Sequence, residues 1–205
     1  LVHVASVEAR LLPEEVGYVY LKSFQDRCSI ELREAVLALA AESPSHRLRG
    51  LVLDLRNNPG GLLDEAVDLA DEFLPSGVIV STRGRNQQSR DEARAQPGGA
   101  LVDLPVIVLV NEYSASAAEI LAGALQDHGR AMLVGTRTFG KGSVQTTFDL
   151  PDNSVVKLTI ARYFTPSGRS IQALGIAPDV VVEQVELDYV WDAEYSPRVV
   201  VPQRS

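Results

Sequence analysis

The chain has 205 residues, of which 45% are hydrophobic and 22% are charged, and this composition is typical of a globular protein. It excludes collagen-like, coiled-coil and low-complexity chains. The formal net charge of −8 argues against a nucleic-acid partner, because binding to a phosphate backbone depends on clustered Lys and Arg.

Membrane, disulfide and metal sites receive no support from the sequence. The longest apolar run, 104–110, is far shorter than the roughly 18 residues of a membrane span. The single cysteine, Cys28, cannot form an intrachain disulfide, and no Cys/His cluster has zinc spacing. Because Leu1 is not methionine and no signal-like segment opens the chain, we expect a processed or excised segment.

The first half of the chain predicts two strands, each followed by a helix. Residues 16–24 predict a strand, and helical spacing follows from Ser29, a plausible N-cap, to the Ser-Pro-Ser stretch at 43–45. The apolar run 50–56 predicts a strand buried on both faces. It leads through Asn-Asn-Pro-Gly-Gly into an amphipathic helix over 62–74.

The second half repeats this unit after a polar stretch. Residues 81–100 predict an exposed loop, and 104–110 predict another buried strand. A small-residue helix over 115–129 and a short strand over 131–135 follow. Alternating segments on either side of Pro-Asp-Asn at 151–153 predict a C-terminal β-hairpin.

Strands that alternate with helices across short connections indicate an α/β fold with a mostly parallel sheet. We expect one core domain over residues 1–183 and a C-terminal extension over 184–205, whose residues show no clear period.

The candidate base is a lysine, because none of the three histidines is framed as one. The chain has sixteen arginines but only three lysines, and Lys141 lies between Gly140 and Gly142. Lysine can serve as a base where arginine cannot, because arginine does not deprotonate in proteins. The alternative is a solvated lysine in a turn.

The candidate nucleophile lies in the Ser-Ala-Ser-Ala run at 114–117, where a buried strand passes into a helix. A serine there can present its hydroxyl while the following N–H groups stabilise an oxyanion. The alternative is structural, because Ser116 with Glu119 forms a capping box and Ser114 could equally be an N-cap.

The turn at 54–61 also follows a buried strand, where open α/β sheets collect ligands. Its paired glycines, Gly60 and Gly61, allow close approach of a backbone N–H to a reacting carbonyl. They could also form an ordinary turn before a helix.

Together these elements resemble the C-terminal processing peptidases, or tail-specific proteases, which are serine proteases with a Ser-Lys dyad. The resemblance runs through LPEEVGYVYLKSF, LVLDLRNNPGGLLDEAVDLADEFL, VIVLVNEYSASAAEILAGALQDHGRA, VGTRTFGKGSVQ and LTIARYFTPSGRSIQALGIAPDV. It implies a crotonase/ClpP-like core, protein or peptide substrates cleaved near the C-terminus, no cofactor and no metal.

The resemblance also assigns the site. It implies that Ser116 is the nucleophile, with Ser114 structural, that Lys141 is the base and that Gln145 holds its amine. The oxyanion hole would combine the N–H of Ala117 with that of a glycine in the Pro-Gly-Gly turn, Gly60 or Gly61.

Two physical requirements follow from this assignment. A lysine amine in water is almost fully protonated at neutral pH, so we expect Lys141 to be desolvated in the active form. Four extended residues span roughly 13 Å, so Gly142 and Ser143 must bend the chain for Gln145 to reach Lys141.

This sequence departs from the family pattern at three places. The family usually has glycine where Tyr113 stands and serine where Ala118 stands, which affects substrate fit more than catalysis. Only about a dozen residues precede the matching segment, where the family carries a PDZ domain. We therefore expect a PDZ domain in a longer parent chain, and the resemblance implies an extracytoplasmic location such as the periplasm, cell envelope or a lumen.

Two alternative functions stay open at this point. A crotonase-like acyl-thioester enzyme would use the same glycine-rich turns without needing Lys141 or Gln145. A catalytically inactive scaffold or peptide-binding protein would keep the fold and use Ser116 with Glu119 only as a helix cap.

Overall fold

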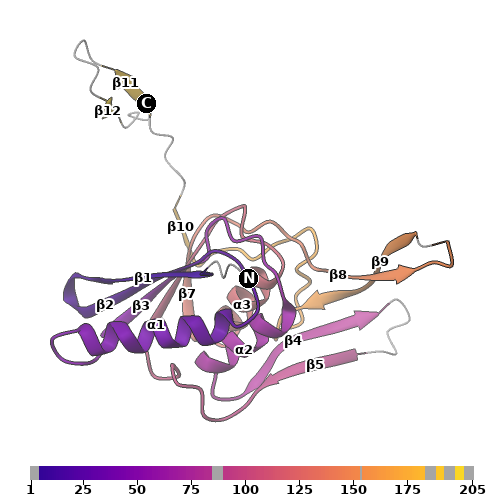
Figure 1. The fold of residues 1–205 in the computed structure, drawn as a ribbon, viewed down its shortest axis with the longest axis horizontal. Coiled ribbons are helices and arrows are strands. Elements are labelled where there is room, and N and C mark those ends of the chain that lie inside the picture. Colours follow the sequence, from indigo (N-terminus) through magenta and orange to yellow (C-terminus); the bar gives the residue numbers. More distant parts are fainter. Residues whose placement is uncertain (1–4, 85–89, 153, 183–187, 192–196, 201–205) are drawn as a thin grey trace.

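The computed structural model describes residues 5–84, 90–152, 154–182, 188–191 and 197–200. Its centre is a six-stranded sheet in the order β1-β2-β3-β6-β7-β10 (Figure 1). The strands are β1 (Val7–Leu12), β2 (Val16–Leu21), β3 (Gly50–Asp54), β6 (Val106–Val110), β7 (Ala131–Gly135) and β10 (Val180–Val181). Only the β1–β2 pair is antiparallel, so the prediction of an α/β fold with a mostly parallel sheet is confirmed.

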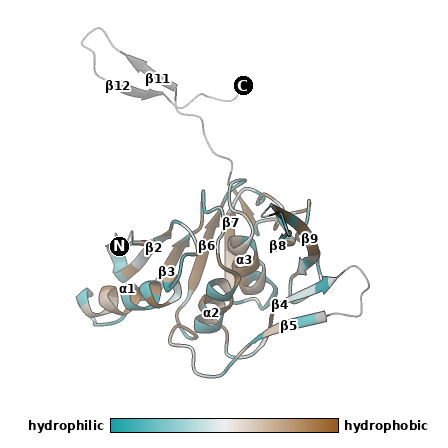
Figure 2. Cartoon of the chain, turned by 45° about the vertical axis from the view of Figure 1, so that its right-hand side comes forward, coloured by the Kyte–Doolittle hydropathy of each residue, from teal (hydrophilic) through white to brown (hydrophobic). Residues whose placement is uncertain are grey.

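The three helices lie on one face of this sheet (Figures 1 and 2). They are α1 (Cys28–Glu42), α2 (Leu63–Phe73) and α3 (Ala117–Asp127), close to the predicted spans. Under this face lies an apolar core in which Leu53, Val108 and Leu133 are fully buried. The core supplies the burial that holds the short strands and helices together.

The prediction that the strand at 50–56 is buried on both faces is wrong, because Val52 is only half-buried. On the face away from the helices, Ile107 is 42% exposed and Met132 is 51% exposed. The strand order β2-β3-β6-β7 advances in one direction, and right-handed crossovers then place every helix on the same side. The opposite face has no helix of the described chain against it.

A second, four-stranded antiparallel sheet has the order β5-β4-β9-β8. It contains β4 (Gly77–Gly84), β5 (Arg90–Ala95), β8 (Ser143–Asp149) and β9 (Val155–Phe164). The β8–β9 pair confirms the predicted C-terminal hairpin. The predicted loop over 81–100 is wrong for 81–84 and 90–95, because pairing of β4 with both β5 and β9 satisfies the backbone of these polar residues.

The N-cap prediction for helix α1 is also wrong. Ser29 lies inside the helix, and the carboxylate of Glu65 on α2 accepts the N–H groups of Arg27 at 2.6 Å and Ser29 at 2.9 Å. A side chain distant in the sequence therefore satisfies the free donors of this helix start.

The C-terminal extension contains a short antiparallel pair, β11 (Asp188–Trp191) with β12 (Pro197–Val200). The rest of 184–205 lies outside the described residues. No helix in the described ranges is both long and apolar enough to cross a bilayer.

Candidate active site

Three turns meet at one end of the parallel sheet. They follow β3, β6 and β7, and they cover residues 55–62, 111–116 and 136–142. Because parallel strands all end at the same edge, these turns are neighbours although they are far apart in the sequence. They carry every predicted site residue except Ala117 and Gln145. Ala117 is the first residue of α3, and Gln145 lies in β8.

Ser116 occupies a strained position at the start of helix α3. Its φ of 58° and ψ of −116° lie outside the regions that non-glycine residues normally adopt. Such strain persists only where the surroundings impose it, and it is concentrated at functional sites. The predicted strand-to-helix junction is therefore confirmed, and Ser116 is the strained residue immediately before α3.

Ser114 has a structural role. It is fully buried, and its hydroxyl donates to the carbonyl of Leu55 at 2.8 Å and accepts the N–H of Asn111 at 3.0 Å. Its hydroxyl is thus occupied in joining the 55–62 turn to the 111–116 turn. The hydrogen bond to Leu55 thus distinguishes Ser114 from Ser116, which the residue pattern alone does not do.

Glu119 joins the serine to the lysine-bearing turn. Its carboxylate is fully buried, and its Oε2 atom accepts the backbone N–H of Ser116 at 2.9 Å and that of Lys141 at 2.8 Å. The Oε1 atom accepts the hydroxyl of Thr138 and the N–H of Gly140, both at 2.6 Å. The half of the expected capping box in which Glu119 accepts the N–H of Ser116 is present, and the same carboxylate also holds the turn around Lys141.

The side chains of Lys141 and Gln145 are exposed. No hydrogen bond joins the Nζ atom of Lys141 to Ser116 or Gln145, which all lie in the described part of the chain. The expected desolvation of Lys141 is not met in this structure, because its side chain is exposed. A β-bulge between Val144 and Gln145 marks a bend near the point where one was expected.

The two glycines of the 55–62 turn differ in what their N–H groups do. The N–H of Gly60 donates to Oδ1 of Asn58 at 2.9 Å, and its carbonyl accepts the N–H of Phe24 at 3.0 Å. The N–H groups of Gly61 and Ala117 have no hydrogen-bond partner among the described residues. Gly60 also touches the 111–116 turn, since a Cβ on it would lie 2.8 Å from Cβ of Ser116.

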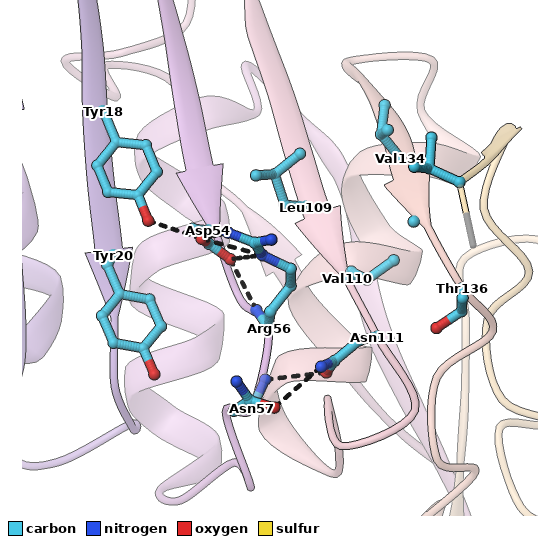
Figure 3. Close-up of a pocket in the computed structure, with 12 residues that line it drawn as sticks. Tyr18, Tyr20, Asp54, Arg56, Asn57, Leu109, Val110, Asn111, Val134 and Thr136 are labelled. Atoms are coloured by element: carbon cyan, nitrogen blue, oxygen red, sulfur yellow. Dashed lines mark hydrogen bonds and ion pairs between the residues drawn. The ribbon is translucent and has the colours of Figure 1, made fainter. Parts of the chain in front are cut away.

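Asparagines connect the same two turns, a contact the residue pattern did not reveal. The N–H of Asn57 donates to Oδ1 of Asn111, and Nδ2 of Asn111 donates to Oδ1 of Asn57, both at 2.9 Å (Figure 3). The carbonyl of Asn58 accepts the N–H of Ala115 at 2.9 Å. The Asn-Asn pair before Pro59 was visible in the sequence, but its partner Asn111 lies far along the chain.

An open cleft lies beside the lysine. Its volume is about 570 Å³, and it is lined by Asn57, Pro59, Tyr113, Ala115, Phe139 and Lys141. The aromatic rings are free for contact, since Tyr113 is 61% and Phe139 is 66% exposed. The cleft therefore offers apolar surface next to the amine.

A second pocket, of about 550 Å³, lies on the other side of Asn57, at the open face of the sheet (Figure 3). There Asp54 accepts the hydroxyl of Tyr18 at 2.7 Å and forms an ion pair with Arg56 at 2.6 Å. Burial alone would raise the pKa of Asp54, but the hydrogen bonds from Arg56 and Tyr18 outweigh burial and lower it. The Asp54–Arg56 ion pair thus stays charged in the pocket that Asn57 also lines.

The described residues contain no group of three or more His, Cys, Asp or Glu side chains that could hold a metal ion. The turns bring a serine hydroxyl, a lysine amine and N–H groups without a hydrogen-bond partner among the described residues to one edge of the sheet. These groups can support acyl transfer without a metal ion.

Comparisons with known proteins agree on one family. Residues 15–182 match the description of Peptidase family S41. The chain is 49% identical over 184 residues to a carboxy-terminal-processing protease of Bartonella bacilliformis, covering 90% of this chain and 42% of that protein. It is 46% identical to a carboxyl-terminal-processing protease of Synechocystis, covering 83% of this chain and 39% of that one.

The fold is also similar to a solved structure, a photosystem II D1 C-terminal processing protease. The TM-score is 0.78 at 36% identity, and the match covers 89% of this chain and 49% of that one. This chain thus spans about two fifths of the length of the curated relatives and half of the solved one.

Proposed function

The chain belongs to peptidase family S41, and we propose that it is a serine endopeptidase that hydrolyses peptide bonds near the C-terminus of proteins with a Ser116–Lys141 dyad. The relatives named as carboxy-terminal-processing proteases support this substrate class. One observation carries the proposal: the backbone of Ser116 is strained, and its N–H donates to the same oxygen of Glu119 as the N–H of Lys141.

The reaction proceeds in two steps. Neutral Lys141 removes the proton of the Ser116 hydroxyl, and the oxygen attacks the scissile carbonyl. Protonated Lys141 then gives this proton to the leaving amine, so that the C–N bond breaks, an acyl-enzyme remains and Lys141 is neutral again. In the second step Lys141 removes a proton from water, which attacks the ester, and returns the proton to the Ser116 oxygen as the acid product leaves. Gln145, whose side chain is exposed beside the turn, would hold the amine once it is aligned.

The oxyanion is bound by the N–H groups of Ala117 and Gly61. The carbonyl of Gly60 points to Phe24, which follows β2, and the C=O and N–H of a trans peptide point in opposite directions. The N–H of Gly61 is therefore directed away from Phe24, toward the β6 side, where Ser116 lies. The N–H of Gly60 is already bound to Asn58, so Gly61 is the better donor.

Substrate binding completes the site by desolvating the lysine. The exposed amine of Lys141 borders the cleft formed with Tyr113 and Phe139. An apolar substrate side chain in this cleft would exclude water from the amine and favour its neutral form. The open cleft is thus the form of the site without substrate. The bound substrate itself excludes water from the Lys141 amine, which the reaction requires.

Two wider features belong to the same proposal. A PDZ domain in a longer parent chain would capture the substrate, in keeping with relatives more than twice the length of this chain. An extracytoplasmic location is proposed from the family resemblance alone.

The test uses an unfolded protein with an apolar C-terminus. The chain is expected to cleave it, Ser116→Ala and Lys141→Ala are expected to abolish cleavage, and Lys157→Ala on the exposed face of β9 serves as the control. A fluorophosphonate probe is expected to label the chain but not Ser116→Ala. Cleavage that survives Ser116→Ala contradicts the dyad. If the unsubstituted chain neither reacts with the probe nor cleaves the substrate, the scaffold alternative is favoured.

A further inference from the structure

A second segment of the chain holds the turn that carries Lys141. Residues 171–176, which come after β9, lie against the 136–142 turn, and the N–H of Ala173 donates to the carbonyl of Gly140 at 2.8 Å. The two backbones are in close contact, since a Cβ on Gly140 would lie 3.2 Å from Cα of Ala173. Both neighbours of Lys141 are buried, although its own side chain is exposed.

One side chain of this segment reaches the residue after the lysine. The Oε1 atom of Gln172 accepts the backbone N–H of Gly142 at 3.1 Å. Gly142 is buried, and a Cβ on it would lie 2.4 Å from the backbone nitrogen of Gln172, so this approach requires glycine. Because an N–H needs an acceptor, the oxygen of the Gln172 amide must be the atom that faces Gly142.

Lys141 is thus held at both of its peptide groups. Its own N–H donates to Oε2 of Glu119 at 2.8 Å, and the N–H of the following peptide group donates to Gln172. Between two planar peptide groups a residue has only two soft dihedrals, φ and ψ. Holding both groups therefore fixes φ and ψ of Lys141, and with them the direction in which its side chain leaves the backbone.

The residue next to Gln172 is strained. Ala173 has a φ of 62°, in the left-handed region that residues other than glycine seldom adopt. In this conformation two adjacent residues bind on either side of the lysine, Ala173 at Gly140 and Gln172 at Gly142. Strain of this kind persists only where the surroundings impose it, and it is concentrated at functional sites.

We propose that Gln172 is a positioning residue for the base. This inference rests on the proposed peptidase function, in which the amine of Lys141 must reach the hydroxyl of Ser116. The amine lies at the end of a flexible four-carbon side chain, so a small rotation of the backbone displaces it by more than the backbone itself moves. Gln172 acts through Gly142 and not on the substrate, so its loss should lower kcat and leave KM nearly unchanged.

Two substitutions separate the acceptor oxygen from the rest of the side chain. Gln172→Met keeps the length of the side chain but removes the oxygen, whereas Gln172→Glu keeps an acceptor oxygen. We expect Gln172→Met to lower kcat on the unfolded protein by about 10- to 100-fold, because misplaced catalytic groups have effects of this size. Gln172→Glu should keep kcat within about threefold of wild type, compared at each variant's own pH optimum because the added charge favours protonated lysine.

Gln126 provides a matched control in the same part of the fold. Its amide nitrogen donates to Ala177 and Asp179, both at 2.9 Å, so it holds the chain just after residues 171–176. Gln126→Met should lower the melting temperature and leave kcat unchanged. Equal losses of kcat in Gln126→Met and Gln172→Met would overturn the inference, because a merely structural role explains them.

Two further outcomes would also overturn it. One is an unchanged kcat in Gln172→Met, and the other is a loss in Gln172→Glu as large as that in Gln172→Met. If Gln172→Met does not fold, Gln172→Asn takes its place, because its oxygen lies one methylene group short of Gly142.

The readouts separate this inference from the peptidase proposal. If the wild-type chain cleaves no protein but reacts with the fluorophosphonate probe, the rate of labelling replaces kcat, and the same order of variants is expected. If it does neither, the peptidase proposal fails, and hydrogen exchange at the Gly142 amide decides whether Gln172 holds the turn. Exchange at least about tenfold faster in Gln172→Met but not in Gln126→Met supports this positioning, and equal exchange overturns it.

Discussion

The backbone N–H groups of Ser116 and Lys141 donate to the same atom, Oε2 of Glu119, at 2.9 Å and 2.8 Å. The proposed nucleophile and the proposed base are therefore positioned by contacts of their backbones. Their backbones are fixed to a buried carboxylate that lies one helical turn after the serine. This contact makes Glu119 a positioning residue for the dyad.

Glu119→Gln is expected to lower kcat by on the order of 100-fold while KM changes little, because small displacements of catalytic groups have effects of this size. The substituted amide would place an NH2 group against N–H or O–H donors that now meet a carboxylate oxygen. Steady-state kinetics and thermal melting measure the two effects. Glu72→Gln, which alters a carboxylate bound to Arg33 and Ala100, should shift the melting temperature only; equal kinetics for both variants would contradict the role of Glu119.

Gly60→Ala is expected to abolish peptidase activity. A Cβ at this position would lie 2.6 Å from the carbonyl oxygen of Ala115 and 2.9 Å from the nitrogen of Ala117, so the nucleophile's turn must move. The φ of +94° adds backbone strain. Gly129→Ala is the control, since it also has positive φ but no heavy atom within 4 Å of its Cβ. Its cost should be about 1–2 kcal/mol of stability with kcat retained, because only the backbone strain of positive φ is added. An active Gly60→Ala would show that the turns are not coupled.

The asparagine pair predicts an asymmetry between two variants. Asn111→Ala removes the acceptor for the N–H groups of Asn57 and Tyr113, so it should lower both kcat and the free energy of unfolding, the latter by about 1–3 kcal/mol. Asn57→Gly keeps its own N–H and suits the φ of 60°, so it should have a much smaller effect. Urea unfolding with parallel assays measures both, and equal losses would contradict the network.

The thiol of Cys28 predicts a fall in stability at high pH. Burial, with the charge of Glu65, raises its pKa from an ordinary 9.0 to about 12. Between these values the unfolded chain loses the thiol proton while the folded chain keeps it, so stability decreases as pH rises, by at most about 1.4 kcal/mol per pH unit. Cys28→Ala should flatten this slope in urea titrations from pH 8 to 11. Iodoacetamide should leave wild-type activity unchanged at pH 8, and inactivation by it would show that the thiol is accessible.

Tyr113→Gly is expected to raise KM for substrates with a large apolar residue by about 3- to 10-fold, with kcat less affected. The ring is 61% exposed and forms one side of the cleft beside Lys141, so its removal reduces the apolar area available to a substrate. Tyr113→Phe keeps that area and should behave as wild type. An unchanged KM in Tyr113→Gly would place the substrate side chain elsewhere.

The strand-turn-helix units could be predicted from the sequence because their patterns are local. The strand at 131–135 and the helices near 63–73 and 117–127 follow from apolar spacing over a few residues. Strand β1 has no such pattern, since Glu8 and Arg10 are exposed on an edge strand. Its existence depends on pairing with β2, which no single segment encodes.

The proposed catalytic residues were predicted from family resemblance, and the contacts that position them join segments distant in the sequence. Nothing near Ser114 and Ser116 distinguishes them, whereas the carbonyl of Leu55, in another turn, does. Ser29 has the residue type of an N-cap, yet Glu65 of the next helix takes that role. The sequence analysis expected Lys141 to be desolvated, but its side chain is exposed. The chemistry requires a neutral amine, and this requirement does not reveal which group would exclude water from it.

The division of the site among three crossovers governs when it can exist. Lys141 follows β7, which pairs beside β6, and its N–H binds Glu119, so a growing polypeptide contains Ser116 before it contains Lys141. Neither a nascent chain nor a fragment ending before β7 can assemble the dyad. The proposed peptidase activity therefore requires a chain long enough to include both Ser116 and Lys141, and a shorter fragment should not hydrolyse peptides.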